Sequence, residues 1–165
     1  MTRVIIKIGD VFSVLVDDNS KKYFQYIAND MTQLNSDVIA VFKKKYAIKE
    51  NLELSQIVKD EVDFYAHCVI KWGIKMNLWI KVGQSKEIRK VETLFRCSND
   101  YGRKLGEEPI KISSNWRVWK INEEFRQVGK LVGESQKAEI GIVVSPTDVV
   151  HRMINGEYNF EYPRY

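Results

Sequence analysis

The chain has 165 residues, of which 44% are hydrophobic and 29% are charged, and its formal net charge is +4. These proportions are those of an ordinary globular protein, and they exclude a disordered tail, a collagen-like chain and a coiled coil. A chain of this length buries enough surface to fold without a disulfide or a metal ion. We therefore expect residues 1–165 to form a single domain.

The first half of the chain alternates apolar and polar residues with the period of two that predicts β-strands. The run Asp17-Asp18-Asn19-Ser20 has the residue types of a turn, so the strands on either side of it are expected to form an antiparallel hairpin. Apolar residues among polar ones at 52–58 predict one short helix. The strands expected in this half are residues 3–8, 11–16, 22–27, 37–42 and 62–72.

The second half contains further strand patterns and then one well-marked helix. Ser145 is placed to cap this helix, Pro146 suits its first position, and Asp148 completes a capping box. Gly156 is placed to end it. The expected strands are residues 76–82, 94–97, 116–121 and 139–144. The sequence therefore predicts a mainly β (β-rich α+β) fold with one or two short helices, either a strongly bent antiparallel sheet or a small SH3-like barrel.

Few residues could carry catalysis. His67 and Cys68 are neighbours, and neighbouring residues on a strand point to opposite faces, so they cannot pair with each other. Cys68 and Cys97 match no metal-binding spacing, and we expect them to pack as small, reduced, apolar side chains. His67 fits a hydrogen-bonded structural histidine better than a functional one. We therefore expect no catalytic residue, metal or cofactor, and keep a hydrolase that uses His67 with Asp63 or Arg96 as a third hypothesis.

The N-terminal residues predict the location. Lys7 and Asp10 interrupt the apolar run that begins at Val4, so the uninterrupted stretch of a signal peptide is missing. No run approaches the length that a membrane-spanning helix needs. We therefore expect a cytoplasmic protein with no membrane partner.

Two groups of residues are candidates for binding a partner. Trp116 and Trp119 lie three residues apart, so one of them should face outward if their strand is regular, and an exposed Trp is a typical protein-contact residue. The loop after residues 94–97 has polar groups suited to recognition. The expected partner-binding residues are Trp116, Arg117, Trp119, Asn99, Asp100 and Tyr101.

Nucleic-acid binding is the alternative. Basic side chains next to exposed Trp residues are typical of proteins that stack single-stranded bases. The net charge is only mildly basic, however, and nucleic-acid-binding proteins usually concentrate positive charge more strongly. The residues expected to contact nucleic acid are Lys43, Lys44, Lys45, Lys71 and Lys75.

Two motifs near the N-terminus share their pattern with a known family. They are Ile6-Lys7-Ile8-Gly9-Asp10-Val11-Phe12-Ser13-Val14 and, after an Asp-rich turn, Lys22-Tyr23-Phe24-Gln25-Tyr26-Ile27. Together they resemble the start of the immunity protein 26 family, small and mainly β proteins predicted to neutralise toxins of bacterial polymorphic toxin systems. The resemblance implies a non-enzymatic, antitoxin-like protein whose partner is a cognate protein toxin. The alternative function is that of a nucleic-acid-binding SH3-like barrel.

Overall fold

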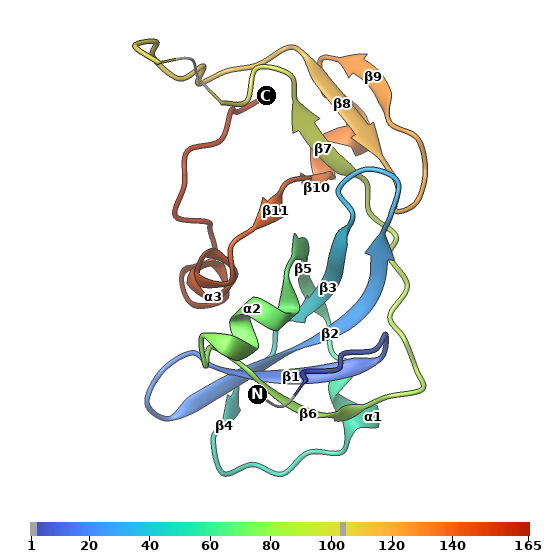
Figure 1. Ribbon diagram of the computed structural model, residues 1–165, viewed down its shortest axis with the longest axis vertical. Helices are drawn as coiled ribbons and strands as arrows, with labels where there is room; N and C mark the ends of the chain where they lie inside the picture. The colour runs from blue at the N-terminus through green and yellow to red at the C-terminus, as the bar shows by residue number, and fades with distance from the viewer. Residues whose placement is uncertain (1–2, 103–104) are drawn as a thin grey trace.

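The computed structural model describes residues 3–102 and 105–165, which form two β-sheets and a few short helices (Figure 1). The larger sheet, sheet A, contains β1 (Asp10–Leu15), β2 (Ser20–Asp30), β3 (Ser36–Phe42), β4 (Tyr46–Ala47), β5 (Val62–Cys68), β6 (Ile80–Gln84) and β11 (Val143–Val144). The smaller sheet, sheet B, contains β7 (Phe95–Ser98), β8 (Trp116–Trp119), β9 (Arg126–Gly129) and β10 (Glu139–Ile140). The helices are α1 (Leu54–Ile57), α2 (Ile70–Lys75), the 3₁₀ helix η1 (Gly133–Lys137) and α3 (Pro146–Asn155).

Sheet A has the strand order β11-β5-β3-β2-β1-β6, and β4 pairs with β2 beside this path. The expected hairpin is confirmed, because β1 and β2 pair antiparallel with Phe12 opposite Phe24. Strands β6 and β11 lie at the two ends of the order and do not pair with each other in the described part of the chain. The fold is therefore β-rich α+β, as predicted, with an open sheet in place of the closed barrel.

The main core lies between one face of sheet A and the helices α2 and α3. The Phe12 and Phe24 rings stack with their centroids 5.0 Å apart, and Trp79 packs edge-on against Phe24. Val149 and Met153 of α3 are buried against this cluster. The opposite face of the sheet carries a second apolar cluster that includes residues of α1. Because both faces are covered, the central strands have nearly continuous apolar sequences.

Helix α3 begins and ends where the sequence predicts. The Ser145 side chain accepts a hydrogen bond from the Asp148 amide over 3.1 Å, and its hydroxyl donates to the Asp148 carboxylate. Gly156 follows the last turn with φ of 84°, a left-handed conformation that glycine adopts without steric cost. No helix in the described ranges is long and apolar enough to cross a membrane.

The strand expected at 76–82 begins only at Ile80, as β6, and the strand expected at 116–121 ends at Trp119, as β8. Two other expected strands are wrong for identifiable reasons. Residues 3–8 form no strand, because the amide and carbonyl of Lys7 bond to Asp10 in a tight turn.

The strand expected at 62–72 stops at Cys68 and α2 follows. Ile70 is the first residue of α2, so its amide has no acceptor within the helix. The Asp37 carboxylate of β3 accepts a hydrogen bond from this amide over 3.1 Å. The residue that caps α2 is thus distant in the sequence, so the local pattern does not reveal the helix.

A short segment joins the two sheets. Glu139 and Ile140 pair parallel with β7 of sheet B, and three residues later Val143 and Val144 pair parallel with β5 of sheet A. The strand expected at 139–144 is therefore split in two. The sheets also share one apolar cluster, to which sheet A contributes Ile27, Val38 and Ala40 and sheet B contributes Phe95, Cys97 and Trp119.

Candidate functional site

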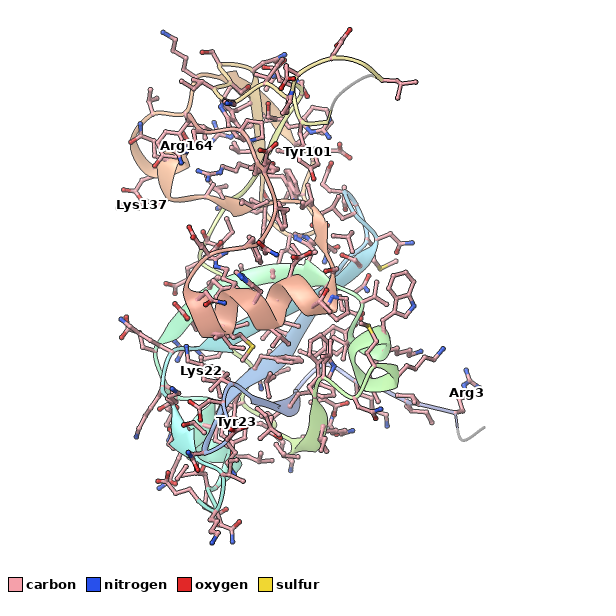
Figure 2. All side chains as sticks on the ribbon, turned by 90° about the vertical axis from the view of Figure 1, so that its left-hand side faces the viewer. Arg3, Lys22, Tyr23, Tyr101, Lys137 and Arg164 are labelled. Carbon is pink, nitrogen blue, oxygen red and sulfur yellow. The ribbon has the colours of Figure 1, made fainter. Side chains whose placement is uncertain are left out.

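A groove with a volume of 1260 Å³ lies beside sheet B, between residues 96–102 and 109–112 on one side and the C-terminal segment, residues 157–165, on the other. Figure 2 shows Tyr101 and Arg164, which line this groove, in the part of the molecule that holds sheet B. The groove combines aromatic and charged side chains. It is therefore the candidate functional site.

The C-terminal segment forms one wall because its sequence alternates. Tyr158, Phe160 and Tyr162 are half-buried, and the polar residues between and before them are exposed. Two backbone hydrogen bonds of 2.8 Å fix the end of the segment, from the Arg164 amide to the Lys111 carbonyl and from the Ser113 amide to the Arg164 carbonyl. The period of two is that of an extended chain with one face against the protein.

Aromatic contacts hold the two walls together. The Tyr101 ring centroid lies 4.8 Å from that of Tyr162, and this contact joins the two walls. Within the C-terminal segment, the Tyr158 and Phe160 rings stack with their centroids 5.0 Å apart. The Tyr162 hydroxyl donates to the Arg96 carbonyl over 3.2 Å. Tyr101 nevertheless keeps 42% of its surface exposed, and Tyr165 keeps 53%. Large aromatic surface is thus available to a partner at the groove.

A chain of hydroxyl groups positions the loop that carries Tyr101. The Ser98 hydroxyl donates to the Ser113 hydroxyl over 2.7 Å, and Ser113 donates in turn to the Asp100 carboxylate over 2.7 Å. The Asp100 amide donates back to the Ser98 hydroxyl. The two serines are buried, so these bonds tie the loop to the end of β7.

The guanidinium of Arg96 is held between two rings. Its Cζ atom lies 5.5 Å from the Trp116 ring centroid and 5.0 Å from that of Tyr165. Its Nη1 donates a long 3.4 Å bond to the Gln136 carbonyl, and its buried Nε has no hydrogen-bond partner. The described lining of the groove carries three basic and three acidic side chains: Arg96, Lys111, Arg164, Asp100, Glu157 and Glu161.

The expectation that Trp116 or Trp119 faces outward is wrong. Trp116 is 0% exposed and Trp119 is 3% exposed. Strand β8 pairs with β7 in continuous register, but its register against β9 shifts between Trp116 and Arg117. Both of its faces are also covered: Leu131 packs on the Trp116 side, and sheet A covers the Trp119 side. The exposed tryptophan is Trp72 of α2, with 59% of its surface open.

The other predicted partner-binding residues divide between two places. Asp100 and Tyr101 line the groove. Asn99 instead bonds to the side chains of Asn115 and Gln127. Arg117 lies over the Phe125 ring, with its Cζ atom 5.2 Å from the centroid, and does not line the groove. The predicted residues do not include the wall that the C-terminal segment forms. The alternation of Tyr158, Phe160 and Tyr162 in the sequence is the signal that indicates this wall.

The five lysines proposed for nucleic acid do not form one patch. Lys43 pairs with Glu61 at 3.3 Å, and Lys45 pairs with Asp17 at 2.7 Å. The hydrogen bond from Lys45 is the largest of the effects that lower the pKa of Asp17 to about 2.

Lys44 lies over the Tyr46 ring, and Lys71 and Lys75 belong to α2. Phe42 pairs with Val62 and Asp37 with Cys68, so the Lys43–Lys45 run and α2 lie at opposite ends of β3.

His67 has no access to a substrate. It is 0% exposed, and its Nε2 bonds to the buried Asp30 carboxylate over 2.9 Å. The expected hydrogen-bonded, structural histidine is confirmed. The structure does not bring His67 together with the partners that the third hypothesis named, because Asp63 pairs with Lys22 and Arg96 lies against Trp116.

Both cysteines are free and buried, as expected. Burial is the main cause that raises the pKa of the Cys68 thiol, which keeps that thiol protonated at neutral pH. Within residues 3–102 and 105–165, no three His, Cys, Asp or Glu side chains gather as metal ligands would. No protein-family model, curated protein or solved structure matches this chain.

Proposed function

We propose that this protein is a non-enzymatic, cytoplasmic immunity protein that binds and neutralises a cognate bacterial toxin, and that the groove is its contact surface. The observation that carries the proposal is the groove itself, where exposed tyrosines and a ring-stacked arginine line one hollow. Tyr and Arg are enriched among the residues that dominate protein–protein binding energy. The N-terminal resemblance to immunity proteins supports the same function.

The charges of the groove favour a protein over a nucleic acid. Nucleic acid is bound mainly through its phosphates, which require an excess of positive charge. The described lining holds Asp100, Glu157 and Glu161 against an equal number of basic side chains. The Lys43–Lys45 run is partly neutralised by its own ion pairs. A protein segment that carries both signs of charge fits this lining better than a polyanion does.

The test is rescue of growth. The tagged protein is used to capture partners from its native host in high salt, and each captured protein is expressed in bacteria with and without this protein. The proposal expects one partner that arrests growth alone and not in the presence of this protein. If every captured protein is harmless, or if the eluate holds only nucleic acid that high salt removes, the proposal is wrong.

Two variants locate the contact surface. Tyr101→Ala removes an exposed ring from the groove, and we expect the affinity for the partner to fall by about tenfold or more. Trp72→Ala removes an exposed ring from α2, outside the groove, and should leave the affinity unchanged. The reverse pattern would move the contact surface from the groove to α2.

A further inference from the structure

The guanidinium of Arg96 is held in place by two aromatic rings but forms no ion pair with a described carboxylate. Its Cζ atom lies 5.5 Å from the Trp116 ring centroid and 5.0 Å from that of Tyr165, its Nη1 makes only the long bond to the Gln136 carbonyl, and it makes no ion pair with the rest of the described chain. An arginine in this position has already lost part of its hydration, and stacking on rings fixes the plane in which its N–H groups point.

Arg152 shows how this fold satisfies a similar arginine. The Arg152 guanidinium packs on two rings, with its Cζ atom 4.0 Å from the Phe64 centroid and 4.8 Å from that of Tyr158. There the N–H groups meet both oxygens of Glu139, at 2.9 Å and 3.4 Å. Such a two-point contact is the strong form of the arginine–carboxylate pair. Arg96 has the rings but, among the described residues, no carboxylate at ion-pair distance. Burial raises the pKa of the Glu139 carboxyl, and the charge of Arg96 acts on Glu139 from farther away and lowers that pKa in part.

We propose that Arg96 anchors an Asp or Glu side chain of the partner protein, so that the groove takes an acidic segment whose carboxylate contacts the guanidinium between Trp116 and Tyr165. The carboxylate contact does not depend on the function proposed above. Only the statement that the partner is a toxin rests on that function. Lys111 and Arg164 lie at the same groove and add to the attraction for acidic side chains.

Asp100, Glu157 and Glu161 limit the ligand. Three acidic side chains along the groove repel a chain of closely spaced phosphates more than a peptide with one or two carboxylates. They also favour basic residues elsewhere in the bound segment. The ligand chemistry is therefore a peptide carboxylate, and nucleic acid is an outcome that the test must distinguish.

The experiment uses peptides, so that it does not depend on finding the partner. A library of random peptides displayed on phage is selected against the full-length protein. Selected peptides should be enriched in Asp or Glu at one position. The enrichment should disappear with Arg96→Gln and persist with Arg126→Gln, an exposed arginine on β9 that does not line the groove. Failure to select peptides, or selection without acidic enrichment, overturns the proposal.

A second measurement keeps the protein unchanged. The best peptide is synthesised with its Glu or Asp and with the corresponding Gln or Asn, and both are titrated against the wild type. Loss of the charged contact should weaken binding by about tenfold or more. Equal affinities would overturn the proposal even if Arg96→Gln proved unstable.

A conservative variant tests the geometry of the contact. Arg96→Lys should bind the peptide with intermediate affinity, because it keeps the positive charge and loses the planar arrangement of N–H donors.

A third arm separates the two proposals. If an oligothymidylate competes with the peptide at physiological salt and binds more tightly, Arg96 is a phosphate site and the carboxylate assignment is wrong. If acidic peptides bind through Arg96 but no captured partner arrests growth, the carboxylate site stands and the immunity function fails. If a toxin is neutralised equally by wild type and Arg96→Gln, the function stands and the anchor fails.

Discussion

The indole N–H of Trp119, in sheet B, donates a 2.9 Å hydrogen bond to the Asp30 carboxylate, at the end of β2 in sheet A, and both side chains are buried. The same oxygen bonds to His67 Nε2 at 2.9 Å, and the other oxygen accepts from the backbone amides of Asn122 and Gln33. One carboxylate thus joins three separate parts of the chain. It also holds the sheet that carries the groove against the larger sheet.

Replacing Asp30 tests how strongly this contact joins the sheets. Asp30→Ala leaves the buried N–H groups of His67 and Trp119 without an acceptor, and the free energy of unfolding should fall by about 3 kcal/mol or more. Glu61→Ala, which breaks an exposed pair with Lys43, should cost less than about 1 kcal/mol. Urea unfolding measures both. Equal losses would mean that the buried contact adds nothing beyond a surface pair.

The pH dependence of stability should report on His67. Burial is the largest cause and lowers the pKa of His67 below its ordinary value of 6.5, against the opposing bond to Asp30. The unpartnered, buried Nδ1 also disfavours a second proton. The folded state therefore resists protonation while the unfolded state accepts it, so stability falls as the pH drops below about 6.5, by up to about 1.4 kcal/mol per unit.

Asp30 extends this loss to lower pH. Burial tends to raise its pKa, but the hydrogen bonds from His67, Trp119 and two backbone amides together lower it, so the stability that its charge contributes decreases as the pH falls below the ordinary value of 3.8. The comparison of wild type with His67→Gln between about pH 8 and pH 5 isolates the histidine, because Glu139, whose pKa burial raises, contributes to the slope of both proteins. His67→Gln should flatten the slope in that range. A slope of the same size in the variant would assign it to other groups.

Gly141, which lies against the Trp119 ring, allows a second test of the contact between the two sheets, by adding a methyl group beside that ring. A Cβ atom at Gly141 would overlap the Trp119 ring, and the hydrogen bond to Asp30 prevents that ring from moving away. Gly141→Ala should therefore destabilise the protein by about 1–3 kcal/mol in thermal or urea unfolding. Gly83→Ala is the matched control, since its Cβ would meet only the flexible end of Leu54. A smaller loss at Gly141 than at Gly83 would mean that Trp119 is not fixed in place.

The elements that the sequence predicts correctly are those whose causes are local. The β1–β2 hairpin follows from alternation and a four-residue turn, and α3 from a cap, a proline and a terminal glycine within twelve residues. Helix α2 is missed because its first amide is satisfied by Asp37, 33 residues earlier in the chain.

The burial of both Trp116 and Trp119 is missed for a similar reason. A strand pattern shows which residues share a face, but not whether a second layer covers that face. The bond between Trp119 and Asp30 spans 89 residues and leaves no local signal. Of the groove, the sequence indicates the Asp100–Tyr101 side, and the alternating aromatic residues Tyr158, Phe160 and Tyr162 are the local signal of the C-terminal wall.

The half-buried ion pair of Arg152 and Glu139, which joins α3 to β10, gives a last prediction. Arg152→Gln leaves the half-buried Glu139 carboxylate with the Tyr65 amide as its donor, and the free energy of unfolding at neutral pH should fall by about 1–3 kcal/mol. Glu134→Gln, which breaks an exposed pair with Lys137, should change it by less than about 0.5 kcal/mol.

The sign of the pH dependence distinguishes an unpaired charge from a simple packing defect. Burial raises the pKa of Glu139 and Arg152 opposes that rise, so removing the arginine raises this pKa further. A carboxyl group with a raised folded-state pKa destabilises the fold above its unfolded pKa, and this penalty disappears as the pH falls and both states become protonated. The loss in Arg152→Gln should therefore shrink from about pH 7 to about pH 4. A loss that stays constant over this range would mean that the variant suffers from missing packing on Phe64 and Tyr158 instead of from a buried charge.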